Sequence, residues 1–267
     1  MTKIDIRTWQ AVHAADFAVP PTPGLTVLVD ELAAALRDPD PEIRDGYPYV
    51  VLRTWIRRDV IGAELRAGLG AVMTSRFGDA EIQARTFAPL VLEMIVSQGD
   101  FDPDWLAAFS RWYPAETDLR GHDPVLGWLH AGAHGADLLG AFGCHPDVRP
   151  AQMLGLAAAR LLAPTDHVFA EQEDDRLANA VSRVLLRPDL SEADAVAWLA
   201  PVEADFAATP SGPAPAHTSN CMRTLRALYV LADLGVRLGE DSARTPLPHR
   251  EAVKRRLAEV LSLVKHG

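Results

Sequence analysis

Residues 40–56 read DPEIRDGYPYVVLRTWI, and residues 79–95 read DAEIQARTFAPLVLEMI. Both segments open with the pattern Asp-x-Glu-Ile, and both continue with apolar residues at helical spacing. The offset of 39 residues between positions 40 and 79 is close to the period of HEAT-type helix pairs. The repetition predicts a fold made of stacked helix pairs.

The matching positions of the two segments form one stripe along each expected helix. These positions are Ile43, Tyr47, Val50, Val51 and Thr54 in the first segment, and Ile82, Thr86, Pro89, Leu90 and Glu93 in the second. A single helix pair cannot bury such a stripe, so the pairs must stack against one another. Each segment also contains a proline, at positions 48 and 89, which is expected to bend its helix.

The composition favours one large helical domain over a disordered chain. Of 267 residues, 48% are hydrophobic and 23% are charged, which is enough apolar material for a continuous core. We therefore predict an all-α fold, a HEAT-like α-α superhelix forming a short α-solenoid of antiparallel helix pairs, with residues 1–267 as a single domain. Helices are expected at about 5–16, 25–37, 40–57, 60–75, 79–97, 103–112, 124–142, 149–162, 172–187, 191–208, 219–238 and 248–264, with a Pro-rich internal loop at 209–218.

The charge of the chain bears on its partners and location. The formal net charge is −10, and lysine occurs only at positions 3, 254 and 265. A negative surface repels phosphate backbones, so we expect no nucleic-acid partner. The N-terminal residues lack the apolar run of a signal peptide, and no apolar stretch is long enough to cross a bilayer. The expectation is a cytoplasmic protein without membrane contact, whose oligomeric state the sequence leaves open.

Residues 118–142, DLRGHDPVLGWLHAGAHGADLLGAF, combine small and polar residues densely. A helix over 124–142 places one apolar face on Trp128, Ala131, Gly135, Leu138 and Phe142. It gathers His130, His134 and Asp137 within about 60° of one another on roughly the opposite side. Glycines at positions 127, 132, 135 and 140 cost a helix about 1 kcal/mol each. We therefore expect a central helix, packed closely against another backbone or a ligand.

The run Gly127-Trp128-x-His130-x-x-x-His134-Gly135-Ala136-Asp137-Leu138-Leu139, preceded by Asp118-Leu119-Arg120-Gly121, resembles the central motif of the bacterial family catalogued as domain of unknown function 2785. Shorter segments resemble other motifs of that family: Arg44-Asp45, Glu171-x-Glu173-Asp174-x-Arg176-Leu177 and Arg223-x-Leu225-Arg226-x-Leu228-Tyr229. The resemblance extends from about residue 30 to 235 and weakens between Gly121 and Gly127. It implies a helical-repeat fold but supplies neither an established activity nor a catalytic residue.

Two interpretations of the polar cluster need no metal. In a buried network, His130 and His134 donate to Asp137, Glu173 or Asp174, while Arg120 or Arg176 neutralises the carboxylates. In a ligand pocket, an aromatic side chain, Trp128 or Trp112, provides a stacking surface and polar side chains provide hydrogen bonds. The candidate ligand-binding residues are Arg120, Trp128, His130, His134, Asp137, Glu173, Asp174 and Arg176.

A metal site is a weaker interpretation of the same residues. His130 and His134 have the i, i+4 spacing of helical zinc ligands, and Asp137 is a third candidate. The metalloprotease motif, however, requires a glutamate directly after the first histidine, where this chain has Ala131. Three ligands on one straight helix also spread over about 10 Å, an awkward reach for one ion. We therefore expect no bound metal.

Three functions from different classes fit these features. The favoured one is a binding or scaffold module that uses a concave groove for a small molecule, a peptide or a protein. An enzyme of unknown reaction is the first alternative, with His130 or His134 as general base, Asp137 orienting it, and Arg120 or Arg176 holding an anionic group. A HEAT-like DNA glycosylase is the second alternative, which the acidic charge disfavours. Because phosphate-loop and dinucleotide motifs are absent, no cofactor is expected.

Overall fold

The computed structural model describes residues 6–239 and 242–264 of the chain. Its first half contains α1 (Ile6–Ala14), α2 (Leu25–Ala35), α3 (Pro41–Arg44), α4 (Tyr47–Arg57), α5 (Ala63–Ser75), the 3-10 turn η1 (Arg76–Gly78), α6 (Ile82–Ser97), α7 (Pro103–Ala115) and the strands β1 (His122–Asp123) and β2 (Gly127–Trp128). Its second half contains α8 (Ala131–Cys144), α9 (Pro150–Leu162), α10 (Glu173–Val184), α11 (Glu192–Ala197), α12 (Ala200–Ala208), α13 (Ala216–Leu234) and α14 (Arg250–Leu261). The prediction of an all-α fold is confirmed.

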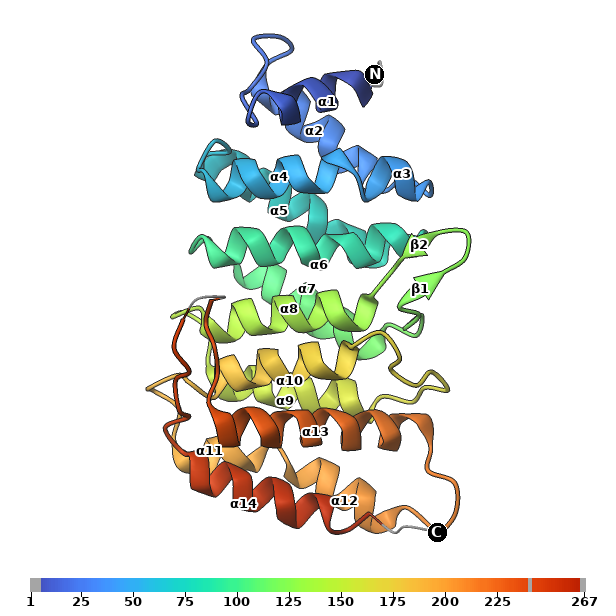
Figure 1. The fold of residues 1–267 in the computed structure, drawn as a ribbon, viewed down its shortest axis with the longest axis vertical. Coiled ribbons are helices and arrows are strands. Elements are labelled where there is room, and N and C mark those ends of the chain that lie inside the picture. The colour runs from blue at the N-terminus through green and yellow to red at the C-terminus, as the bar shows by residue number, and fades with distance from the viewer. Residues whose placement is uncertain (1–5, 240–241, 265–267) are drawn as a thin grey trace.

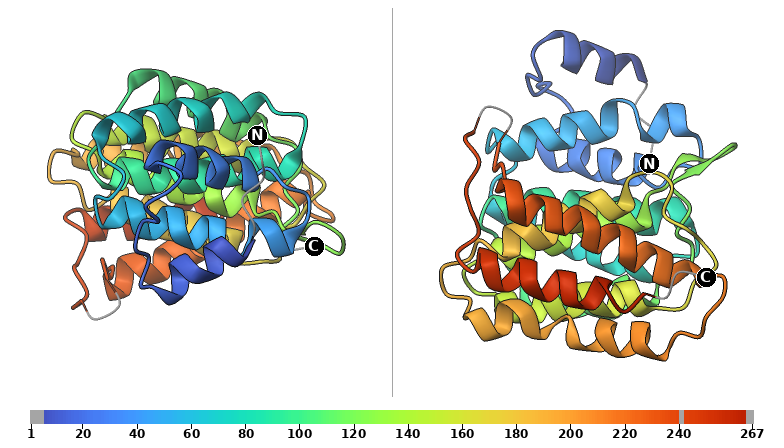
Figure 2. Two further views of the ribbon diagram at one scale, coloured as in Figure 1. Left: turned by 90° about the horizontal axis from the view of Figure 1, so that it is seen from above. Right: turned by 60° about the horizontal axis from the view of Figure 1, so that its bottom comes forward.

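The helices form layers along the long axis of the molecule. Helices α4, α6, α8, α10 and α13 lie one beside the next in that order, and we call them the front layer (Figure 1). Helices α5, α7 and α9 lie behind them. The β1–β2 hairpin projects from the side on which α8 begins, and α14 packs along α13 (Figure 2). The start of α8 is thus placed at the edge of the front layer.

One cluster of buried apolar side chains runs through the described part of the chain, from Trp9 in α1 to Val260 in α14. Among the described residues, no helix combines the length and the apolar character needed to cross a membrane. The Pro-rich connection before α13 is irregular from Thr209 to Pro215, because α13 already begins at Ala216. The predicted loop is therefore shorter than 209–218.

Two predicted helices are each divided in two. The helix expected at 40–57 breaks at Asp45 and Gly46, and the one expected at 191–208 breaks at Trp198 and Leu199. In both, a proline stands in the first turn of the second piece, Pro48 in α4 and Pro201 in α12. A proline ring collides with the carbonyl four residues before it, so the chain restarts a helix instead of bending one. Pro89, by contrast, lies inside α6 as predicted.

The prediction of a helix over 124–142 is wrong in its first part. The Asp123 carboxylate accepts hydrogen bonds from the N–H groups of Val125 and Leu126, at 2.8 and 2.9 Å, and closes the hairpin turn. Gly127 and His130 have φ angles of +69° and +56°, in the left-handed region that a right-handed helix excludes. Helix α8 therefore begins at Ala131, and Trp128 does not share an apolar helix face.

Helix α8 is buried almost throughout, since only Asp137 and Cys144 escape burial. A Cβ atom built on Gly135 would lie 2.1 Å from the Tyr113 ring in α7. A Cβ atom on Gly140 would lie 3.3 Å from the Cα of Ala180 in α10. These glycines therefore allow α7 and α10 to approach α8 more closely than larger residues permit.

The close approach at Gly135 is testable with a matched glycine. We expect Gly135→Ala to lower the free energy of unfolding by about 1–3 kcal/mol, because the new methyl group overlaps the Tyr113 ring. Gly155 lies in α9 with open space around its Cα. Gly155→Ala should raise stability by up to about 1 kcal/mol through helix propensity alone. Urea unfolding of both variants measures these effects. A change of stability in the same direction in both variants would contradict the close packing at Gly135.

Candidate functional site

A hollow of about 300 Å³ lies on the front layer, close to the start of α8. We call it the front hollow. It is lined by Asp45, Tyr49, Phe87, Leu90, Trp128, His130, His134 and Arg176. These residues come from the α3–α4 break, α4, α6, β2, the start of α8 and α10, so that the hollow spans four neighbouring front-layer helices.

His134 is neutral and its tautomer is fixed. Its Nδ1 atom lies 2.9 Å from the backbone oxygen of Thr86, and a carbonyl oxygen only accepts, so Nδ1 carries the proton. Burial, aided by the charge of Arg176, lowers the pKa of His134 well below its ordinary value. The Nε2 atom consequently presents a lone pair, and no described residue donates to it.

Trp128 and His130 form an aromatic stack at the edge of the front hollow. Their ring centroids lie 4.6 Å apart with an interplanar angle of 6°. Trp128 keeps 46% of its surface exposed, whereas the His130 side chain is 14% exposed. The left-handed backbone of His130 turns the chain from β2 into α8 and thereby brings its ring next to that of His134, at 5.6 Å between centroids.

Glu173 lies beside His130 as a buried carboxylate. Its Oε2 atom accepts from the N–H of Glu171 at 2.8 Å. Its Oε1 atom lies 3.9 Å from Nδ1 of His130, and both of these atoms are buried without a hydrogen-bond partner. Burial by itself raises the pKa of Glu173, but His130 and the N–H groups of Glu171 and Glu173 lower it, leaving the pKa below its usual value. The carboxylate is therefore ionised at neutral pH.

Asp137 does not join the histidines. Its carboxylate accepts two hydrogen bonds from the Arg176 guanidinium, one of them from Nε at 3.2 Å. The prediction that Asp137 orients a histidine is therefore wrong, because the charged arginine is the stronger partner. In residues 6–239 and 242–264, no group of three His, Cys, Asp or Glu side chains is placed to hold a metal ion.

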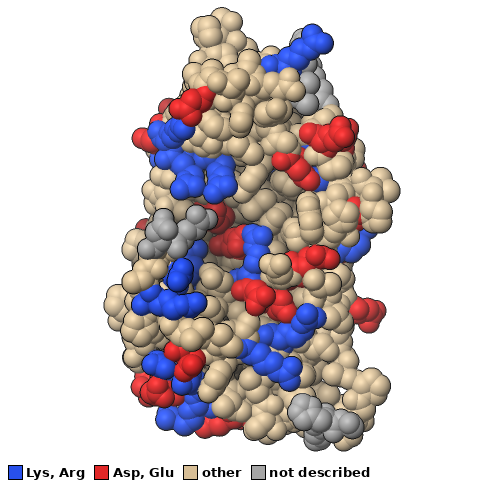
Figure 3. Space-filling view, viewed as in Figure 1, with Lys and Arg blue, Asp and Glu red and all other residues tan. Residues whose placement is uncertain are grey.

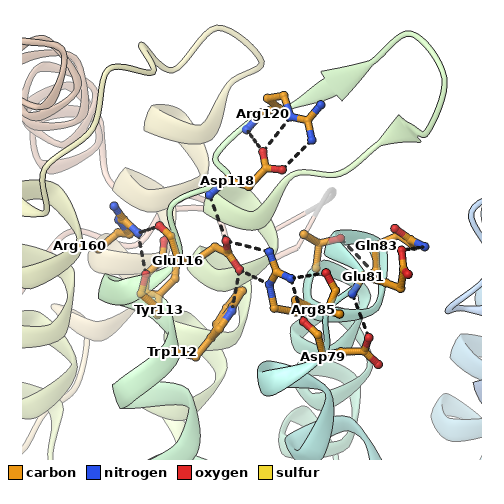
Figure 4. A network of polar contacts seen from close by, with 12 residues as sticks. Asp79, Glu81, Gln83, Arg85, Trp112, Tyr113, Glu116, Asp118, Arg120 and Arg160 are labelled. Carbon is orange, nitrogen blue, oxygen red and sulfur yellow. Dashed lines mark hydrogen bonds and ion pairs between the residues drawn. The ribbon is translucent and has the colours of Figure 1, made fainter.

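Arg120 and Asp174 also lie outside the front hollow. Arg120 pairs with Asp118, at 2.6 Å from Nη2 (Figure 4). It also pairs with Asp123 of the hairpin. Asp174 pairs with Arg223 of α13 at 2.9 Å. Of the eight candidates, only Trp128, His130, His134 and Arg176 line the hollow. A sequence motif does not reveal which way an arginine side chain turns, so these assignments required the structure.

Arg44 holds the hairpin that carries Trp128. Its fully buried guanidinium donates to the backbone oxygens of Leu126 and Trp128, at 2.6 and 3.3 Å, and to the Asp45 carboxylate at 2.7 Å. It also lies over the Phe87 ring, 4.9 Å from the centroid. Arg44 and Asp45 are therefore positioning residues for the aromatic wall of the front hollow.

Sequence reasoning missed several residues of the site, namely Asp45, Tyr49, Phe87 and Leu90 of the lining and Thr86 as the acceptor for His134. All five lie within the two repeated segments, 40–56 and 79–95. The repetition signals that these segments are equivalent helices, but it does not signal that both face the same hollow. That relation depends on how α4, α6 and α8 stack.

Residues 73–230, more than half of the chain, match the model of a family described as a protein of unknown function (DUF2785). The chain belongs to this family. Comparisons with curated proteins and with solved structures found no match. The range matched to DUF2785 includes β2, α8, α10 and most of α13, whereas Arg44 and Asp45 precede it.

The structure brings the motif segments noted in the sequence into contact. Arg44 reaches the carbonyl of Trp128, Glu173 lies beside His130, and Asp174 pairs with Arg223. The segments are thus neighbours around the start of α8. In this member of the DUF2785 family, their polar residues form one continuous region and not four separate features.

The role of Arg44 predicts a large effect on stability. We expect Arg44→Met to lower the free energy of unfolding by about 2–4 kcal/mol, because it removes a fully buried charged donor from two part-buried carbonyls and from the Asp45 carboxylate. Arg53→Met on α4 is the matched control, since this arginine is exposed and has no hydrogen-bond or ion-pair partner among the described residues. Urea unfolding, with hydrogen exchange at residues 122–128, measures both effects. Equal stability losses would contradict a positioning role.

The buried neutral state of His134 predicts a pH dependence. The unfolded chain binds a proton at this histidine near pH 6.5, whereas the folded chain does so only at lower pH. The stability contributed by neutral His134 is therefore complete above about pH 6.5 and falls below it, by up to about 1.4 kcal/mol per pH unit. In His134→Asn, whose amide N–H can replace Nδ1–H, this part of the slope should vanish. Urea unfolding from pH 5 to 8 tests whether the difference between the two proteins depends on pH.

Proposed function

We propose that this protein is a ligand-binding module built on a HEAT-like α-α superhelix. The repeat of 39 residues and the alternation of front-layer and rear helices support the superhelix. The front hollow is the proposed binding site, for a small molecule or for one side chain of a peptide or protein. Its volume of about 300 Å³ is at the lower end of the range of ligand pockets.

The observation that carries the proposal is the Nε2 atom of His134, to which no described residue donates, in the wall of the hollow that the half-exposed ring of Trp128 also lines. A histidine that serves only the fold usually pairs both of its nitrogens, because unpaired polar atoms in a poorly hydrated place are costly. His134 pairs one nitrogen with Thr86 and turns the other toward the hollow. The hydroxyl of Tyr49 also has no hydrogen-bond partner among the described residues and lines the same space.

Volume alone favours a different hollow, so the choice rests on chemistry. A larger hollow of about 530 Å³ lies between α5, α6 and α7. Its two carboxylates are already paired, Glu116 with Arg85 and Asp79 with Arg37. Glu116 uses both oxygens, which also accept from Trp112 and from the N–H of Asp118 (Figure 4). Both carboxylates are thus satisfied within the protein, although the Thr74 hydroxyl of the same hollow is not, whereas no described residue donates to Nε2 of His134 in the front hollow.

One observation favours a second candidate function, an enzyme with acid–base chemistry. Nδ1 of His130 and Oε1 of Glu173 lie 3.9 Å apart, and neither atom has a partner. A carboxylate behind one imidazole nitrogen, with the ring facing a pocket, is the arrangement in which a histidine transfers protons. Glu173 thus replaces Asp137 as the residue that orients the proposed base. A substrate would then bind in the same hollow.

The experiment compares two amide variants of His134, each of which reproduces the position of one ring nitrogen. His134→Asn retains a donor at the position of Nδ1 and removes Nε2, whereas His134→Gln places its amide near Nε2 and abandons Thr86. Wild type, both variants and Trp128→Ala are screened by thermal shift against small aromatic compounds, amino acids, small anions and divalent ions. Metal analysis of the purified wild type accompanies the screen.

We expect compounds that stabilise the wild type to lose their effect on His134→Asn and Trp128→Ala, while both variants remain folded. If His134 serves only the fold, His134→Asn will leave every ligand response intact. Metal found in equimolar amount would show that the protein binds an ion and would contradict the proposed ligand. A complete absence of stabilising compounds for the wild type would count against a small-molecule site.

A further inference from the structure

Four arginines of the front layer have no hydrogen-bond or ion-pair partner within the described ranges. They are Arg53 and Arg57 on α4, Arg183 on α10 and Arg226 on α13. Arg53, Arg57 and Arg226 are exposed, and Arg183 is partly exposed. Exposed arginines without side-chain partners also occur elsewhere on the described chain, at Arg111 and Arg149, so the argument rests on where these four lie.

Helical spacing places these arginines on the same face as the front hollow. Arg53 and Arg57 follow Tyr49 by four and eight positions, and so continue its stripe along α4. Arg183 follows Arg176 by seven positions on α10. Arg226 stands one turn after Arg223, which pairs with Asp174 of α10. Viewed from the front, basic side chains gather at the level of α4 and again toward α10 and α13 (Figure 3).

Acidic side chains lie between these two basic regions. Glu93 of α6 stands three positions after Leu90 of the hollow, and its carboxylate accepts only from Ser97 among the described residues. Asp137 of α8 is held by Arg176. The unpaired arginines of the front face therefore lie on either side of Glu93 and the Asp137–Arg176 pair, and Arg176 lines the front hollow together with Trp128.

We propose that the front face binds an extended acidic peptide segment, with acidic residues toward both ends and an uncharged aromatic residue between them. This inference rests on the proposed function, because the aromatic residue occupies the front hollow. Carboxylates near each end pair with Arg53 and Arg57 on one side and with Arg183 and Arg226 on the other. Arginine suits this task, since its planar fork matches a carboxylate and it stays charged at any physiological pH.

The charge pattern favours a peptide over a nucleic acid. A phosphate backbone is uniformly negative, so it places charge opposite Glu93 and Asp137 as well as opposite the arginines. A peptide can leave its centre uncharged. Four steps between neighbouring helices, each about 8–10 Å, separate α4 from α13. An extended chain at about 3.3 Å per residue crosses that distance in about 10–12 residues.

The test uses three fluorescein-labelled probes and fluorescence anisotropy. The first is a 13-residue peptide with glutamates in the outer four positions at each end and one tyrosine among serines in the middle. The second has the same composition with the glutamates in the middle. The third is a single-stranded oligothymidine of comparable length. Binding is measured with wild type, Arg53→Gln/Arg57→Gln, Arg183→Gln/Arg226→Gln and the control Arg111→Gln/Arg149→Gln, whose exposed arginines lie on α7 and before α9 without side-chain partners in the described ranges.

We expect the first peptide to bind more tightly than the second. Each front-face double variant should weaken it by about five- to tenfold, as the loss of two exposed charge pairs implies, while the control leaves it within about twofold. Added salt should weaken binding by the wild type more than by the variants. Equal binding of the two peptides, equal losses in the control, tighter binding of the oligonucleotide, or no binding each overturns the proposal.

The outcome is separable from that of the proposed function. Trp128→Ala, which retains all four arginines, should weaken the first peptide, whereas a peptide with serine in place of tyrosine should bind wild type and Trp128→Ala alike. If the arginine variants weaken the peptide but Trp128→Ala does not, the basic regions bind acidic chains without the hollow. If small compounds bind the hollow but no peptide binds, the proposed function stands and the acidic partner is excluded.

Discussion

Helix α8 is buried along nearly its whole length because glycines stand where neighbouring helices press against it. Gly135 receives the ring of Tyr113, and Gly140 receives the backbone of α10. The Tyr113 hydroxyl donates to the carbonyl of Gly132 at 2.8 Å and so fixes the first turn of the helix. The polar groups of the front hollow follow from this packing, since the closeness of α6 lets Thr86 bind His134, and the closeness of α10 places Glu173 beside His130.

Two buried carboxylates, those of Glu116 and Glu173, differ in how completely they are hydrogen-bonded. Glu116 has a partner for each oxygen, and hydrogen bonds from Arg85 keep its pKa below its usual range although burial alone raises it. It ties α6 and α7 to the segment that leads to the hairpin. Glu173 is more deeply buried, yet one of its oxygens is unpaired. An unpaired buried polar atom costs about 1–3 kcal/mol, and this cost falls on the carboxylate beside His130 and not on Glu116.

The unpaired polar and charged groups of the front face are the basis of the proposed binding site. A neutral histidine, a half-exposed tryptophan and unpaired arginines are each common on protein surfaces. Their placement on strand β2 and on four helices of one layer, α4, α8, α10 and α13, is what suggests recognition. Layered helices suit such recognition because each helix adds its own row of side chains to a shared surface. The formal net charge of −10 repels acidic ligands over most of the surface, so the unpaired arginines are what make the front face the proposed site for an acidic segment.

The sequence by itself determined the helical class, the repetition between 40–56 and 79–95, and the close packing of the glycine-rich segment, because these follow from local periodicity and residue size. It also identified the region of Trp128, His130 and His134. It failed at the start of α8, where an Asp123 turn and the left-handed residues Gly127 and His130 override a helical pattern. Only the tertiary structure decided which polar groups pair. Asp137 pairs with Arg176, His134 donates to the Thr86 carbonyl, and Arg120 pairs with Asp118. Most of these pairs join residues that are far apart in the chain, so the spacing of residues along one helix does not predict them.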